Sequence, residues 1–367
     1  MSFFLKKFKL PLLYKYVIFE IIKPFILILL LLHIIIFIHT SYDYLQKVAS
    51  GVITKSVLFP LIFFENIISL EVLIPLSFYL GCIIILSRMD DNSELTAMLS
   101  SGFSSRKIFK PIIMLTISVA ILSALLSNFI RPWSYKNIYL LEHYAKQTFD
   151  ITRISKGHFI SFDDGSKIIY ADDKIKPNIL KDVFLYTKST KDEITDEIIY
   201  AKKAYLNEEN NKLKDLLILE DGAIYMFNSG SGKETFSKFK NIYIDIGNTK
   251  SALEYESKAS PTFELLSKNT NSNIAELEWR LTVPFMTLFL GLLSIALSRS
   301  SPRIKKRSQK IIIAILIYIT YYNLYDIVEE WVKDGLIPAI PGTFWLTLLL
   351  FITYIYIRFK TSREYLY

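Results

Sequence analysis

The sequence RMDDNSELTAMLSSGFSSRKIFKP, residues 88–111, lies between two long apolar runs and has the residue pattern of a short helix. Asn92 and Ser93 are residue types that cap the starts of helices. Glu94 then falls in the first turn, where an acid interacts favourably with the helix dipole. Gly102 is typical of a helix end, so the sequence predicts a short helix outside the apolar runs.

The predicted helix carries a small apolar stripe, formed by Leu95, Met98 and Leu99. Their i, i+3, i+4 spacing places them on one face. A short amphipathic helix outside a bilayer packs either on lipid headgroups or on another protein. Three acids would face an anionic leaflet in the first case, so the sequence favours a basic pocket on a protein partner. These acids are Asp90, Asp91 and Glu94.

Six apolar runs are long enough to cross a bilayer, which needs about 20 residues of helix. The chain has 367 residues, is 51% hydrophobic and has a mean hydropathy of +0.32, values typical of a membrane protein. The predicted spans cover residues 21–39, 58–87, 108–130, 281–297, 311–331 and 339–357.

Residues 131–275 have a different pattern, in which short β-branched or aromatic segments alternate with polar positions. Turn signals such as DDGS at 163–166 and EDG at 220–222 separate these segments. Seven or eight segments of this kind predict an antiparallel sandwich or roll. The sequence thus predicts an N-terminal transmembrane half at 1–130, an all-β, jellyroll-like domain at 131–275 and a C-terminal transmembrane half at 276–367.

The charges predict which side of the membrane each part occupies. The N-terminus, the 88–110 and 299–310 loops and the C-terminus after Ile357 together hold 18 Lys and Arg against five acids. The β region holds 21 of each sign. By the positive-inside rule, both termini are expected in the cytoplasm and residues 131–275 outside it. The distribution of the +8 net charge therefore argues against nucleic-acid binding.

No constellation of residues predicts an enzyme. Cys82 is the single cysteine, and the four histidines show no metal-ligand spacing. GSGK at 230–233 resembles part of a phosphate-binding loop, but Phe227 stands where glycine is needed and Glu234 where Ser or Thr would hold magnesium. We therefore expect no catalytic residues, no metal and no cofactor, and we expect any ATP to be bound by a separate subunit.

Two acids and three cations near the ends of the spans are candidates for function. Glu65 and Glu71 lie in an apolar run, where ionisable residues are costly, so a proton relay is one hypothesis. The favoured interpretation is that the long second run protrudes and both acids lie near the outer surface. Arg131, Arg280 and Lys333 lie at outer span ends, where they either anchor the helices at the interface or bind anionic lipid headgroups at a cavity mouth.

Together these features resemble the LptF/LptG permease family of the lipopolysaccharide-export ABC transporter. The resemblance covers nearly the whole chain and is most specific in residues 88–102, with their arginine, acid, Ser-Glu, apolar and glycine pattern. Thr96, two places after Glu94, is closer to the LptF branch than to the LptG branch. Further matching residues are Tyr16, Glu20, Lys23-Pro24-Phe25, AELEWR at 275–280, Leu297-Ser298 and Pro302-Arg303.

The resemblance implies a permease in the bacterial inner membrane with a periplasmic β-jellyroll. The region near 90–105 would be the coupling helix, which docks into a groove of an LptB-like cytoplasmic ATPase, where Glu94 meets an arginine. An LptG-like permease would complete a cavity for lipopolysaccharide, and LptC-like and LptA-like jellyroll proteins would receive the lipid. The coupling residues implied are Glu94, Leu95, Met98, Leu99 and Gly102.

Two other functions fit part of the sequence. A proton-coupled secondary transporter would use Glu71 and need no ATPase. An envelope scaffold or sensor would use the β domain only to bind a partner. Loss of transport in Glu71→Gln but not in Glu94→Ala would support the transporter, whereas co-elution with an ATPase that Glu94→Arg removes would support the exporter.

Overall fold

The structure is a computed structural model, and its described part divides into two compact units. One unit contains most of the long apolar helices, and the other carries the β-strands. The described residues are 11–49, 53–147, 156–162, 167–176, 178–188, 195–206, 216–228, 234–245, 257–267, 270–298, 307–338 and 340–364.

The six predicted spans each fall largely within one long helix. These helices are α2 (Leu12–Ala49), α3 (Lys55–Asp91), α5 (Ser105–Leu125), α8 (Asn271–Ser298), α9 (Arg307–Lys333) and α10 (Phe344–Glu364). Among the residues that the structure describes, five stretches are long and apolar enough to cross a membrane, and the apolar part of α10, Phe344–Phe359, is shorter. Helices suit this environment because all their backbone hydrogen bonds are made internally.

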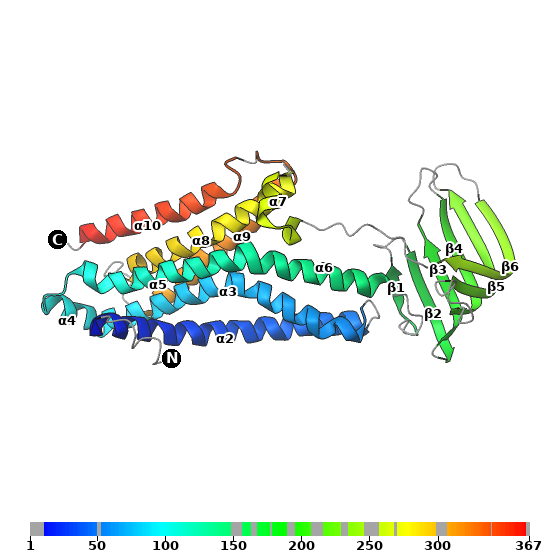
Figure 1. The fold of residues 1–367 in the computed structure, drawn as a ribbon, viewed down its shortest axis with the longest axis horizontal. Coiled ribbons are helices and arrows are strands. Elements are labelled where there is room, and N and C mark those ends of the chain that lie inside the picture. Colours follow the sequence, from blue (N-terminus) through cyan, green and yellow to red (C-terminus); the bar gives the residue numbers. More distant parts are fainter. Residues whose placement is uncertain are drawn as a thin grey trace. The chain divides into compact units, whose positions relative to one another are not determined.

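Two short helices and one extension complete the helical unit. The predicted helix after the second span is present as α4, Glu94–Ser100. A π-helical turn, Leu126–Ile130, continues α5 into α6, Arg131–Gln147. The chain re-enters the unit at Ser257–Ala259 and α7, Thr262–Ser267. Figure 1 shows that α2 begins and α10 ends at the same end of the bundle as α4, as an even number of crossings requires.

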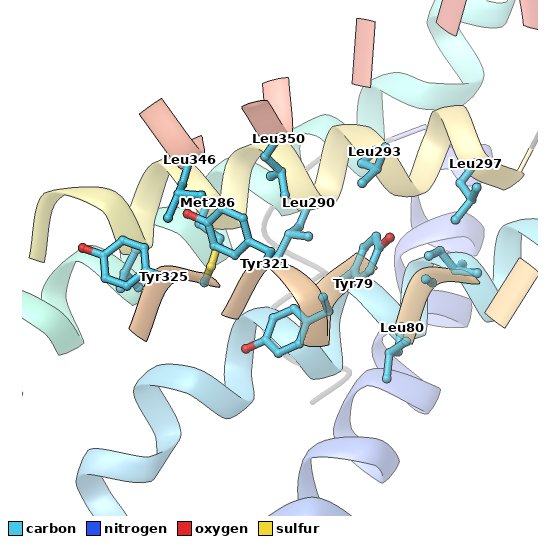
Figure 2. Close-up of a cluster of buried hydrophobic side chains, with 14 of the residues drawn as sticks. Tyr79, Leu80, Met286, Leu290, Leu293, Leu297, Tyr321, Tyr325, Leu346 and Leu350 are labelled. Carbon is cyan, nitrogen blue, oxygen red and sulfur yellow. The ribbon is translucent and has the colours of Figure 1, made fainter. Parts of the chain in front are cut away.

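The bundle is held together around α8, which packs against α5, α9 and α10. Figure 2 shows the apolar face of α8, with Leu290 and Leu293, beside the rings of Tyr79 from α3 and Tyr321 from α9. A second buried cluster joins α2, α3 and α5. Cys82, in α3, is fully buried within this second cluster.

Close packing of α5 on α8 depends on Gly291. A Cβ at this position would overlap the Thr116 side chain, so glycine lets the two helices approach closely. We expect Gly291→Ala to destabilise the bundle by roughly 1–3 kcal/mol, the usual cost of overpacking. Thr116→Ala in the same chain should restore part of the loss in thermal unfolding. An unchanged melting temperature in Gly291→Ala alone would contradict the tight contact.

The second unit contains one antiparallel sheet whose strands follow sequence order (Figure 1). The six described strands are β1 (Phe159–Phe162), β2 (Lys167–Lys176), β3 (Ile179–Thr187), β4 (Thr195–Leu206), β5 (Leu216–Asn228) and β6 (Glu234–Asp245). Alternate residues such as Leu217 and Leu219 are buried in a shared apolar core, as strand geometry requires. The predicted fold class, a helical membrane protein with an inserted antiparallel β domain, is confirmed.

One predicted turn is instead an irregularity within a strand. The EDG sequence at 220–222 lies inside β5, where Asp221 has φ 50° and is skipped in the pairing with both neighbouring strands. A Cβ at Gly222 would overlap the Phe239 ring of β6, so the glycine makes room for a cross-strand aromatic. The pairing keeps the same register on both sides of Asp221, so the strand continues through residues whose composition also fits a turn.

Candidate functional site

The helix α4 ends as the sequence predicts but begins differently. The Gly102 N–H donates to the Leu99 carbonyl and the Phe103 N–H to the Met98 carbonyl, and Gly102 has φ 86°. These two bonds form a Schellman motif, which favours glycine at this position. At the start, Ser93 has φ 60° and makes no side-chain capping bond. The predicted serine cap is therefore wrong, because the left-handed backbone at Ser93 replaces the usual cap geometry.

The apolar residues of α4 point to two different partners. Leu95 is buried and Met98 is half-buried, and both pack on the cluster that joins α2, α3 and α5. Leu99 is 40% exposed, and Phe103, which lies outside the predicted stripe, is 41% exposed. Two residues of the predicted stripe thus fix α4 to its own bundle. Leu99 and Phe103 remain as an outward apolar pair.

Glu94 is held in place by the first turns of α2. Its Oε2 accepts a hydrogen bond of 2.8 Å from the Tyr16 hydroxyl, and its Oε1 lies 3.4 Å from the Asn92 amide nitrogen. A second tie joins Arg88 to Glu20 at 2.8 Å. An ionised carboxylate has about four acceptor positions, so Glu94 keeps the capacity to accept a further donor.

Asp90 forms an ion pair with Lys310, a residue 220 positions away along the chain. The ammonium group of Lys310, at the start of α9, lies 3.2 Å from Asp90 and also donates to the Ser298 carbonyl at the end of α8. Lys310 is only 2% exposed. Of the three acids expected to face a partner, Asp90 is thus neutralised within the chain, whereas Asp91 is exposed. Sequence reasoning missed this pair because nothing local links the two residues.

Glu71 is buried inside the bundle, and its predicted depth near the outer surface of the membrane stays a prediction. It is 1% exposed and accepts hydrogen bonds from Arg131 at 2.7 Å, Ser127 at 2.6 Å and Trp279 at 2.8 Å. The arginine supplies the opposite charge that makes burial of the carboxylate tolerable. Glu65, six residues earlier, is half-buried.

Glu276 joins Arg131 and Arg280 into one cluster with Glu71. Its carboxylate accepts from Arg131 at 3.1 and 3.2 Å and from Arg280 at 2.9 Å. Arg280 is fully buried, and it also donates to the Ser260 carbonyl and the Thr262 hydroxyl, both at 2.9 Å. The two arginines predicted at the headgroup level therefore have protein partners in this structure.

Lys333 lies apart from that cluster, in the last turn of α9. Its ammonium group is 2.8 Å from Glu329 and 3.0 Å from Glu330, and its side chain is 24% exposed. Both acids lie within one turn of the same helix, so this is a local surface pairing of modest strength. Lys333 keeps an exposed face that Arg131 and Arg280 lack.

Two other predicted features fall on residues that the structure does not describe. The GSGK sequence at 230–233 and most of the basic 299–310 loop lie outside the described ranges. Within the described ranges, no group of three or more His, Cys, Asp and Glu side chains is arranged to hold a metal ion.

Comparison with known proteins identifies the family. The model of the "Lipopolysaccharide export system permease LptF/LptG" family matches residues 15–360. The chain is similar to the lipopolysaccharide export system permease protein LptF of Escherichia coli K12, with 24% identity over 318 residues that cover 84% of each chain. The same figures hold for LptF of Shigella flexneri. The chain therefore belongs to the LptF/LptG family of lipopolysaccharide export permeases, membrane subunits of an ABC transporter that have no ATPase domain and rely on a separate ATP-binding subunit.

Proposed function

We propose that this permease is the LptF-type subunit of its exporter, paired with an LptG-like permease and driven by an LptB-like ATPase that docks on α4. The complex extracts lipopolysaccharide from the inner membrane and passes it to the β unit. The observation that carries the docking site is the arrangement of α4, in which Leu95 and Met98 hold the helix on the bundle while Leu99 and Phe103 face outward.

The side chains around this outward pair suit a basic groove on the ATPase. Glu94 is positioned by Tyr16 and keeps acceptor capacity for an arginine of the partner. Gly102 ends the helix with a φ of 86°, which directs the chain back toward α5 directly after the docking surface. The contacts of Leu95 and Met98 with the bundle would pass movement of the ATPase to α2, α3 and α5.

The orientation we propose places both termini and α4 in the cytoplasm and residues 131–275 in the periplasm. It is supported by the 18 basic residues against five acids on the side of the termini. In the periplasm, the first and last strands of the described sheet, β1 and β6, have one unpaired edge each. Such edges suit strand addition by the LptC-like and LptA-like jellyroll proteins.

Purification in detergent tests the assembly. The wild-type chain should co-elute with a second, LptG-like permease and with an ATPase that carries a true phosphate-binding loop. A stable homodimer of this chain that exports without an ATPase would overturn the proposal in favour of a secondary transporter. The structure gives that rival little support, since the carboxylate of Glu71 is occupied by Arg131, Ser127 and Trp279.

Lys333 is the strongest of the three headgroup candidates because its side chain is partly exposed. We expect Lys333→Glu to reduce photocrosslinking of lipopolysaccharide to the cavity roughly tenfold, the effect of losing one charge-assisted hydrogen bond. Lys107→Glu, an exposed lysine near α4, is the matched control and should leave crosslinking unchanged.

The headgroup role of Arg131 and Arg280 stays a prediction of the same kind. Contact with a phosphate would require their bonds to Glu71 and Glu276 to open during the transport cycle. Arg280→Glu should then weaken crosslinking as Lys333→Glu does. Unchanged crosslinking in both variants would make these residues anchors of the helices and not lipid ligands.

A further inference from the structure

We infer that the buried four-charge cluster of Glu71, Arg131, Glu276 and Arg280 is a mechanical junction. The cluster fixes two connections to α3 and α8. Through the first the chain leaves the bundle toward the unit with the β-strands, and through the second it returns from that unit. Helix movements in the transport cycle would then reach both connections together. The inference rests on membership of an ATP-driven permease family and is independent of the docking role proposed for α4.

On the exit side, the cluster holds the base of α6, the helix through which the chain leaves the bundle. Arg131 is the first residue of α6, and its guanidinium donates to Glu71 of α3 and Glu276 of α8 at 2.7–3.2 Å. It also lies 5.3 Å from the ring centre of Trp279 on α8. The base of α6 therefore cannot pivot against α3 and α8 without separating buried charges.

On the return side, Arg280 holds the segment 257–262, where the described chain resumes after the strands. Besides Glu276, it donates to the Lys258 carbonyl at 3.1 Å, and to the Ser260 carbonyl and the Thr262 hydroxyl at 2.9 Å each. With a longer bond of 3.4 Å to the Ser257 carbonyl, this fully buried arginine fixes four groups of the returning segment to α8. A second contact brings the Thr262 hydroxyl to within 3.2 Å of the Asn128 carbonyl, in the turn that precedes α6.

Glu276 links the exit side of the cluster to its return side. Its Oε1 accepts both from Nε of Arg131 and from Nε of Arg280. The charges of the two acids and the two arginines cancel. Each arginine bonds to elements that are far apart in the sequence. An apolar core would stabilise the bundle at least as well, but it would lack directional bonds. Directional, charge-assisted bonds fix the relative geometry of the elements they join.

The test uses a charge-balanced double variant, Glu71→Gln with Arg131→Met, in the complete export complex. The amide oxygen of the introduced glutamine can still accept from Ser127 and Trp279, and Glu276 keeps Arg280, so no buried charge is left unpaired. Arg131→Met alone leaves Glu71 without its cation and is expected to reduce the amount of folded protein. The double variant should therefore accumulate to the wild-type amount. Any change in its transport would then report the mechanical role of the cluster and not its role in folding.

Spin labels on cysteines introduced in place of Lys136 of α6 and Glu264 of α7 report the geometry of exit and return. Both positions are exposed, and the single native cysteine is fully buried. In the wild-type background we expect one narrow distance distribution, whereas in the double variant it should broaden. Export per ATP hydrolysed should fall roughly fivefold or more, within the range of couplings between sites, while ATP hydrolysis is retained.

The matched control neutralises a partly buried ion pair of the bundle, through Asp90→Asn with Lys310→Met. This change is equally charge-balanced but lies at the end of the bundle near α4, so the distribution between positions 136 and 264 should stay narrow. The Glu71→Gln/Arg131→Met variant could instead keep a wild-type distance distribution or wild-type export per ATP. Either result would mean that the cluster only stabilises the fold, and the inference would be overturned. Loss of ATP hydrolysis together with export would also overturn it.

Discussion

Glu94→Arg is expected to release the ATPase from the purified permease and to lower export by roughly 30- to 1,000-fold. Replacing the carboxylate by a cation removes an acceptor and places like charges together at the proposed basic groove. A central charged residue of an interface contributes about 2–4 kcal/mol, which corresponds to that range. Co-elution of the ATPase and ATP-dependent lipid release in vesicles measure the two effects.

Two further variants show whether the effect of Glu94→Arg comes from lost docking, from the change of charge alone or from the positioning of Glu94. Asp91→Arg makes the same change of charge at an exposed acid of the same loop, and we expect a much smaller effect. Tyr16→Phe removes only the 2.8 Å bond that positions Glu94, so it should weaken docking without abolishing it. Retention of the ATPase by Glu94→Arg would place the docking surface elsewhere on the chain.

Glu276→Gln is expected to give the largest loss of stability among single substitutions in the bundle. The change keeps the size of the side chain but leaves Arg280 without its carboxylate partner and Arg131 with Glu71 alone. Breaking a buried ion pair by removing one partner costs about 3–5 kcal/mol. The amount of folded protein in the membrane and its melting temperature in detergent should both fall.

Glu278→Gln is the matched control for this substitution. Glu278 lies on the same helix and is also buried, but it accepts from the backbone N–H and hydroxyl of Thr343. A glutamine oxygen can accept the same bonds, so the expected change is within about 1 kcal/mol. Equal losses of stability in Glu276→Gln and Glu278→Gln would mean that the ion pairs of Glu276 contribute no more than the hydrogen bonds of Glu278.

The larger elements could be predicted from the sequence because each depends on neighbouring residues. Runs of about 20 apolar residues require a helix in a bilayer, and alternation at period 2 requires a strand with one buried face. The end of α4 at Gly102 was predictable for the same reason, since a left-handed residue after a helix favours glycine. The EDG irregularity in β5 was not, because its composition fits a turn equally well.

Patterns of neighbouring residues are enough to predict the apolar spans around a β insert, the short helix after the second span and the family of this chain. The pairing of Glu71 with Arg131, of Asp90 with Lys310 and of Tyr16 with Glu94 becomes visible only once the helices are packed. The physical reason is that a pattern of neighbours specifies which face of an element is apolar. The partner of a buried charge depends on which distant elements pack against that face.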